Sequence, residues 1–95
     1  MILKKPKLLH WTSHACAKMR QYGLSQSRVH RIIHSPTRIE KGIAPNTVAY
    51  MQRAGSAKHP HELWTMVSDK ADRRNIVSAW RYPGVTKKGE PLPSA

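Results

Sequence analysis

Apolar side chains recur at helical spacing near the start of the chain. Ala15, Met19 and Tyr22 follow one another at i, i+4 and i+7, which predicts a helix with one apolar face. Either Thr12 or Ser13 can accept a hydrogen bond from a free N–H group of the first turn, and a glycine, a helix-ending residue, follows Tyr22. We therefore expect a short helix that begins after one of the two hydroxyl residues and ends at Tyr22.

A second helix is predicted after a link of two or three residues. One face of this helix carries Val29, Ile32 and Ile33, in the segment QSRVHRIIH, and Ser25 precedes it as a capping residue. Pro36 limits the segment, because the residue before a proline resists helical geometry. The short link makes the two helices a tight hairpin.

Beyond Pro36 the pattern changes to short runs of strand-forming residues separated by turn chemistry. These runs are TRIEKGI, TVAYMQRA, LWTMVS and NIVSAWRY. Two helices followed by three or four strands with short connections predict an α+β fold, with the helical hairpin packed on a three- to four-stranded antiparallel sheet. Upstream, Leu8 and Leu9 either begin an edge strand or pack under the first helix.

Hydrophobic alternation in LWTMVS leaves the orientation of the sheet open. Leu63 and Val67 share one face of this strand, whereas Trp64 and Met66 share the other, and both sets are apolar. The pattern does not decide which set lies under the helices, or whether the opposite face of the sheet is open.

The chain has 95 residues, which predicts one α+β domain at residues 1–84 and a flexible basic tail at residues 85–95. No apolar run is long enough to span a membrane, and the N-terminus lacks the apolar core of a secretion signal. Cys16 is the single cysteine, so no internal disulfide is expected. These features predict a cytoplasmic protein.

Basic residues greatly outnumber acidic ones. Lys and Arg total 17 and Asp and Glu total 5, which gives a formal net charge of +12. Such an excess predicts a polyanionic partner, which is RNA, DNA, an anionic membrane surface or an acidic protein. The charge carries no information about the fold.

His14 and Lys18 are the first candidates for chemistry. They lie four residues apart on one face of the first predicted helix and flank its apolar stripe. A neutral histidine can act as a general base near pH 7, and a lysine can stabilise the charge that develops on a phosphate. The alternative is that His14 satisfies backbone groups at the start of the helix and that Lys18 is simply solvated.

Arginines in or beside the predicted strands form a second candidate group. A guanidinium can clamp a phosphate through two hydrogen bonds, and an aromatic side chain beside it can stack on a base. Trp80, Arg81 and Tyr82 bring both kinds of group together. The alternative places the two aromatic rings in the core and Arg81 in solvent. With Arg20 of the first predicted helix, the candidates for nucleic-acid binding are Arg20, Arg38, Arg53, Arg73, Arg74, Trp80 and Arg81.

Neither a metal site nor a bound cofactor is expected. Histidine pairs at i, i+4 need further ligands to hold zinc, and the five acids are too scattered for the carboxylate cluster of a two-metal nuclease. RNA cleavage by this chain would therefore proceed without metal, through attack of the 2′-hydroxyl on the adjacent phosphate. The histidines concerned are His10 with His14, His30 with His34, and His59 with His61.

A resemblance to a known family rests on the segment SHACAKMRQYGLSQSRVHRIIHSPTRIE. Small uncharacterised bacterial and archaeal proteins of this family begin with a His-Ala helix that contains an Arg-Met or Met-Arg pair. A Gly-Ile-Ser or Gly-Leu-Ser link, a short helix, a proline turn and strands follow. The resemblance covers residues 10–82, and the matching positions are His14, Ala15, Met19, Arg20, Gly23, Leu24, Ser25, Pro36 and Arg38.

The family looks like a branch of the RelE/barnase-like nuclease superfamily, in which two helices precede a four-stranded sheet. Many such proteins are toxins of toxin–antitoxin pairs that cut RNA, and others have lost activity. The resemblance implies an RNase-toxin-like fold, an RNA substrate and an acidic antitoxin as partner. It also implies His14, Arg20 and Arg38 as functional positions. This chain departs from the family at Tyr22, where an arginine often stands, and in its long segment APNTVAYMQRAGSAKHPHE.

The sequence thus predicts a RelE/barnase-like α+β protein that binds RNA, free or on the ribosome, and cleaves it without metal. His14 is the expected general base or acid, and Lys18 and Arg38 are the expected phosphate contacts. One rival hypothesis is a non-catalytic nucleic-acid- or ribosome-binding module of the same fold. Another is a purely structural partner of an acidic protein. No membrane contact is expected.

Overall fold

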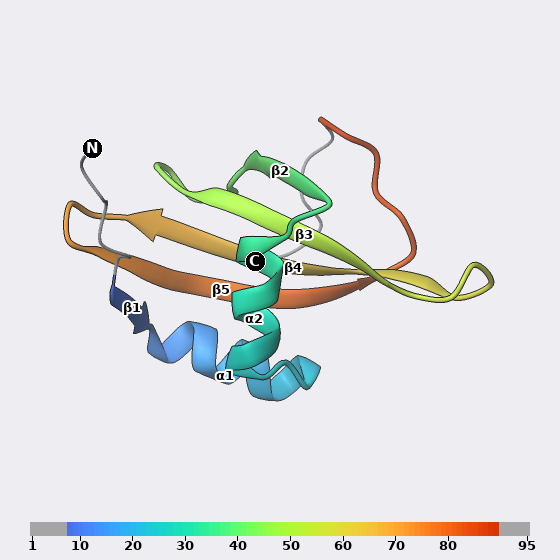
Figure 1. Ribbon diagram of the computed structural model, residues 1–95, viewed down its shortest axis with the longest axis horizontal. Helices are drawn as coiled ribbons and strands as arrows, with labels where there is room; N and C mark the ends of the chain where they lie inside the picture. Colours follow the sequence, from blue (N-terminus) through green and yellow to red (C-terminus); the bar gives the residue numbers. More distant parts are fainter. Residues whose placement is uncertain (1–7, 90–95) are drawn as a thin grey trace, which may run out of the picture.

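The computed structural model describes residues 8–89 and has an α+β fold of two helices and a five-stranded mixed sheet (Figure 1). The strand order across the sheet is β1-β5-β4-β3-β2. Within residues 8–89 no helix has the length and apolarity needed to cross a membrane. The elements are β1 (Leu8–Trp11), α1 (Ser13–Tyr22), α2 (Gln26–His34), β2 (Arg38–Lys41), β3 (Val48–Gly55), β4 (Pro60–Asp69) and β5 (Arg73–Pro83).

Both helices begin and end where the sequence predicts. Of the two predicted caps of α1 it is Thr12 whose Oγ1 accepts a hydrogen bond, from the Ala15 N–H at 3.1 Å. Gly23 follows α1 with φ at 67°, in the left-handed region that disfavours residues with a Cβ. Ser25 caps α2 through a hydrogen bond from the Arg28 N–H at 3.0 Å. The link of three residues is as short as predicted, but the helices do not pair as a tight hairpin: α1 packs along β5, whereas α2 runs in a different direction and packs on β3 and β4 (Figure 1).

The sheet has one strand more than predicted, and it is mixed rather than antiparallel. The strands β2, β3, β4 and β5 form the expected antiparallel meander. The additional strand is β1, which pairs in parallel with β5, from Leu8 opposite Arg73 to Trp11 opposite Ile76. Two leucines are too short a run to reveal a strand by periodicity, and the partner strand lies at the other end of the chain. The edge-strand alternative for Leu8 and Leu9 is thereby confirmed.

Apolar side chains of β4 alternate between the two faces of the sheet, and those on each face belong to a different buried cluster. Leu63 and Val67 pack with apolar residues of both helices in one buried cluster. Trp64 and Met66 lie on the opposite face, in a second cluster. Trp64 stacks on Trp80 with ring centroids 5.9 Å apart, and both rings are fully buried. The second face is therefore also part of the core.

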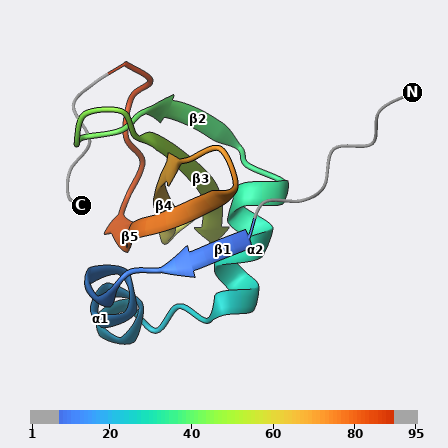
Figure 2. The same ribbon diagram turned by 90° about the vertical axis from the view of Figure 1, so that its left-hand side faces the viewer.

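The helix α1 packs along the second half of β5, beyond the part of that strand that pairs with β1. The strand β1 ends opposite Ile76, and from there α1 runs along β5 (Figure 1 and Figure 2). The Thr12 hydroxyl donates to the Ile76 carbonyl at 2.9 Å, where the chain turns from strand to helix. Tyr22, at the far end of α1, packs against both apolar clusters. The end of α1 is thereby held beside the end of β5.

Glu62 holds the chain that follows β5. Its side chain is fully buried on the second face of the sheet and accepts a hydrogen bond from Trp64 Nε1 at 3.1 Å. It also accepts from Thr86, at 3.0 Å from the backbone N–H and 2.7 Å from the hydroxyl. Arg38 donates to the same threonine, at 3.0 Å to the carbonyl and 2.6 Å to the hydroxyl.

Part of the predicted C-terminal tail lies among the described residues. Besides the contacts of Thr86, the Gly89 N–H donates to a carboxylate oxygen of Glu40 at 3.2 Å. Residues 84–89 thus run from the end of β5 across the second face to β2 (Figure 1). The remainder of the predicted tail, residues 90–95, lies outside the described residues.

Glu62→Gln is expected to lower the free energy of unfolding by about 1–3 kcal/mol, because an amide N–H₂ group then faces buried hydrogen-bond donors. Chemical denaturation followed by tryptophan fluorescence measures the change. Asp72→Asn is the matched control, because Asp72 is exposed in the turn before β5. Equal stability of the two variants would contradict the anchoring role of Glu62.

Candidate functional site

The three residues expected to carry catalysis are not brought together. His14 is exposed in the first turn of α1. Lys18 lies one turn further along, with its Nζ 5.1 Å from the centroid of the Tyr22 ring. Arg38 lies in β2 opposite Met51, whose side chain belongs to the second apolar cluster. The sheet therefore separates Arg38 from the face that the helices cover.

Arg38 binds groups of the protein itself. Its Nε forms an ion pair with Glu40 at 2.9 Å, and its guanidinium carbon lies 5.2 Å from the centroid of the Trp64 ring. The two remaining nitrogens donate to Thr86. These contacts give Arg38 a structural role, which is to hold the segment after β5 against the second face.

Arg74 is also engaged within the protein. Its Nε and Nη2 donate to the Asp69 carboxylate at 2.7 and 3.1 Å, and its guanidinium carbon lies 5.7 Å from the Tyr50 ring centroid. The hydrogen bond to Asp69 raises the pKa of Arg74 above its ordinary value, although burial acts in the opposite direction. Arg74 is therefore held as a cation that is paired with Asp69.

The other predicted nucleic-acid contacts divide into exposed and buried residues. Arg20, Arg53 and Arg73 are exposed, in α1, β3 and β5 respectively. Trp80 is fully buried, and its ring stacks on Trp64. Trp80 therefore presents no free ring face on which a base can stack, and the alternative that places it in the core holds.

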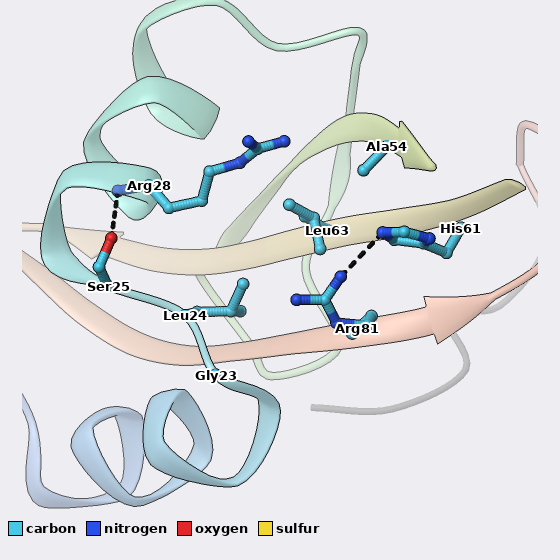
Figure 3. Close-up of a pocket in the computed structure, with 8 residues that line it drawn as sticks. All are labelled: Gly23, Leu24, Ser25, Arg28, Ala54, His61, Leu63 and Arg81. Atoms are coloured by element: carbon cyan, nitrogen blue, oxygen red, sulfur yellow. Dashed lines mark hydrogen bonds between the residues drawn. The ribbon is translucent and has the colours of Figure 1, made fainter. Parts of the chain in front are cut away.

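Arg81 is the predicted residue that shapes a cavity. Its Nη1 lies 2.8 Å from Nε2 of His61, and its Nη2 donates to the Tyr22 carbonyl at 3.2 Å. One guanidinium thus joins the end of β5, the start of β4 and the end of α1. Figure 3 shows the contact between His61 and Arg81 on the two neighbouring strands, with Gly23 and Leu24 of the link between the helices lining the same cavity.

The strand register explains why these side chains meet. Leu63 lies opposite Arg81 on the neighbouring strand, and His61 lies two residues before Leu63 on the same face of β4. All three side chains therefore point to the helix side of the sheet. Gly55 makes room for the imidazole, because a Cβ at this position would lie only 2.7 Å from His61 Nδ1.

We call the cavity the Arg28–Arg81 pocket. Its volume is about 300 Å³, and Arg28 reaches into it from α2 while Arg81 and His61 reach into it from the sheet (Figure 3). None of the described residues that line it is acidic. The Nε of Arg28 is buried and has no hydrogen-bond partner among the described residues. The lining residues are Gly23, Leu24, Ser25, Arg28, Ala54, His61, Leu63 and Arg81.

The pocket also contains the start of α2. Ser25 is the N-cap of that helix, and the free N–H groups of a first helical turn attract anions. Two guanidinium groups and a helix N-terminus thus face one cavity whose lining lacks carboxylates. This arrangement suits a phosphate or another small anion, which guanidinium groups bind through paired hydrogen bonds.

The contact with Arg81 determines the protonation pattern of His61. A guanidinium has only donors, so Nε2 of the imidazole must be the acceptor of this hydrogen bond. The ring is therefore neutral in this arrangement and carries its proton on Nδ1, the nitrogen that lies against Gly55. The lone pair of Nε2 accepts the Arg81 hydrogen bond.

A second cavity adjoins the first, and we call it the Tyr22–Pro83 pocket. Its volume is about 600 Å³. It shares His61 and Arg81 with the Arg28–Arg81 pocket, so the two cavities meet at this pair. The lining residues are Tyr22, Lys58, His59, Pro60, His61, Arg81 and Pro83.

Sequence reasoning missed two residues of this site. His61 entered only as one of the candidate zinc ligands in HPH, and Arg28 was not singled out. For His61, the alternation of side chains along the strand contains the information that was not used, because His61, Leu63 and Val67 share one face of the strand. It becomes informative only once the helices are known to cover that face.

The histidines do not gather into a metal site in the described part of the chain. Within residues 8–89 no group of three or more His, Cys, Asp or Glu side chains is placed to hold a metal ion. His30 and His34 stack with ring centroids 6.4 Å apart, and Trp11 makes an edge contact with His30.

No protein-family model, curated protein or solved structure matches this chain. The RelE/barnase-like resemblance stays a prediction from the sequence, carried by the motif from His14 to Arg38. The site is therefore described from its own geometry.

Inorganic phosphate is expected to shift the backbone amide NMR signals of Gly23–Ser25, His61 and Arg81 during a titration. Arg81→Ala is expected to weaken this binding about tenfold, the effect of losing one hydrogen bond between ions. Lys70→Ala is the charge-matched control, because Lys70 is exposed at the other end of the ten-residue strand β4, about 30 Å away. Equal weakening by both variants would mean that phosphate binding depends only on the net charge of the protein.

Proposed function

We propose that this protein binds RNA and cleaves it without a metal ion at the Arg28–Arg81 pocket. The observation that carries the proposal is this pocket itself, in which Arg28, His61 and Arg81 converge without an acid in a chain of net charge +12. The RelE/barnase-like motif of the sequence supports the same function. An acidic antitoxin protein is the partner that this function implies.

Phosphate binding accounts for the cationic groups of the pocket. The two guanidiniums come from different layers of the fold, Arg28 from α2 and Arg81 from β5, so a phosphate between them can be held from two sides. The exposed arginines provide further contacts to neighbouring phosphates of a longer strand, which strengthens binding at low salt. These residues are Arg20, Arg53 and Arg73.

Cleavage needs a base for the 2′-hydroxyl, and His61 is placed to act as one. When a phosphate oxygen takes the Nη1 hydrogen bond of Arg81, Nε2 of His61 is released and can accept the hydroxyl proton. The 2′ oxygen then forms a bond to phosphorus, the bond from phosphorus to the 5′ oxygen breaks, and that oxygen takes a proton from solvent. Arg28 and Arg81 stabilise the charge on the phosphoryl oxygens. The products are a 2′,3′-cyclic phosphate and a 5′-hydroxyl.

The same hydrogen bond favours a second function, which is that of a non-catalytic nucleic-acid- or ribosome-binding module. While Arg81 occupies Nε2 at 2.8 Å, the imidazole has no free lone pair for a substrate proton. Phosphate binding by the remaining donors would then not lead to cleavage. The two functions separate in a cleavage assay.

RNA incubated with the purified protein in excess EDTA is expected to yield fragments that end in 2′,3′-cyclic phosphate. His61→Ala is expected to lower the cleavage rate about 10²–10⁴-fold, because it removes the general base. His34→Ala is the matched control, because His34 is exposed at the end of α2 and stacks on His30. Gel electrophoresis gives the rate, and mass spectrometry identifies the fragment ends.

His14→Ala tests the assignment that the sequence favours. A loss of rate in this variant, with full activity in His61→Ala, would place the reaction on α1 and refute the pocket assignment. Salt-sensitive RNA binding by the parent protein, with no cleavage in any buffer, would instead support the binding module.

A further inference from the structure

We infer that the Tyr22–Pro83 pocket holds the base of the nucleotide whose phosphate lies in the Arg28–Arg81 pocket, so that the substrate is an unpaired nucleotide. The inference rests on the proposed function, since it assumes a phosphate in the first pocket. It adds a second subsite and a requirement for single-stranded RNA.

The shared wall between the two cavities is the first argument. His61 and Arg81 line both, so a ligand that fills both must carry two different groups joined across this pair. The first cavity offers guanidinium groups for an anion, whereas the second offers a tyrosine and two prolines. A nucleotide has this composition, with a phosphate joined through a sugar to a flat, partly apolar base.

The lining of the Tyr22–Pro83 pocket suits a base. Tyr22, Pro60 and Pro83 supply apolar and aromatic surface, and Lys58 and His59 supply polar groups at the loop between β3 and β4. Small-molecule sites in proteins are typically lined in this way, with volumes of about 300–1,000 Å³. The volume of this cavity, about 600 Å³, lies in that range.

Tyr22 is fixed by contacts that also involve the first pocket. Its carbonyl accepts the Arg81 hydrogen bond at 3.2 Å, and its ring lies 5.1 Å from Lys18 Nζ. This hydrogen bond therefore links Tyr22, which lines the base subsite, to Arg81, which would bind the phosphate. Lys18, an expected phosphate contact, lies one helical turn from this subsite.

Base pairing would block entry to the second pocket. The bases of a duplex are stacked and paired, whereas unpaired bases can turn outward and stack on an aromatic side chain. Paired RNA would bring its phosphates to the basic surface but leave the base subsite empty. Selectivity for unpaired RNA is thus a consequence of the second pocket.

The test compares adenosine 5′-monophosphate and uridine 5′-monophosphate with ribose 5-phosphate, which has the same charge and no base. Calorimetry on the full chain is expected to show about tenfold tighter binding of at least one nucleotide, the contribution of stacking one base. In Tyr22→Leu this advantage is expected to fall to less than twofold. Lys70→Ala is the control, because its exposed side chain lies beyond the opposite end of β4.

A second measurement does not depend on a variant, since Tyr22 also packs against the core. Nuclear Overhauser effects between base protons and the Tyr22, Pro60 or Pro83 side chains are expected in the parent protein. Equal affinity for nucleotides and ribose 5-phosphate, without such effects, would refute the base subsite and leave the phosphate site intact. No binding of any of the three ligands would refute the proposed function itself.

Discussion

Six consecutive residues of β4, from Glu62 to Val67, are buried, and this strand determines how the rest of the chain is arranged. Successive side chains point to opposite faces, so the strand needs cover on both sides. The helices α1 and α2 cover the face that carries Leu63 and Val67. On the other face, Trp64 and Met66 pack in the second cluster, and the buried carboxylate of Glu62 holds residues 84–89 against this face through Thr86.

This arrangement also determines where positive charge is left unbalanced. The acids Glu40, Glu62 and Asp69 bind groups of the protein itself, on the second face or at the far end of β4. The described residues that line the Arg28–Arg81 pocket include no acid. The chain has only 5 acids against 17 basic residues, and three of the acids are used in this way, so the pocket has no carboxylate counter-charge among the described residues. A bound anion would supply the negative charge that the described lining lacks.

Features set by local chemistry were predictable, and features set by distant partners were not. The caps at Thr12 and Ser25 act within one helical turn, and both are found where the sequence predicts them. The strand β1 could be offered only as one of two alternatives, because its partner lies at the other end of the chain. Arg81 stood out beside aromatic residues and does line the pocket, whereas His61 depends on which face meets the helices. The structural contacts of Arg38 depend on Thr86, which is equally remote in sequence.

In the function that we propose, the hydrogen bond between Arg81 and His61 decides whether the pocket only binds RNA or also cleaves it. A guanidinium has five N–H donors, of which His61 Nε2 and the Tyr22 carbonyl use two, so a phosphate can bind without disturbing either contact. A phosphate oxygen is nevertheless a better acceptor than a neutral imidazole, because its negative charge attracts the guanidinium. The proposed cleavage requires that the Nη1 donor move from the imidazole to the phosphate, which frees Nε2 only when a phosphate is present. The base would then become active in the presence of the substrate, which explains how one pair of residues can serve both subsites.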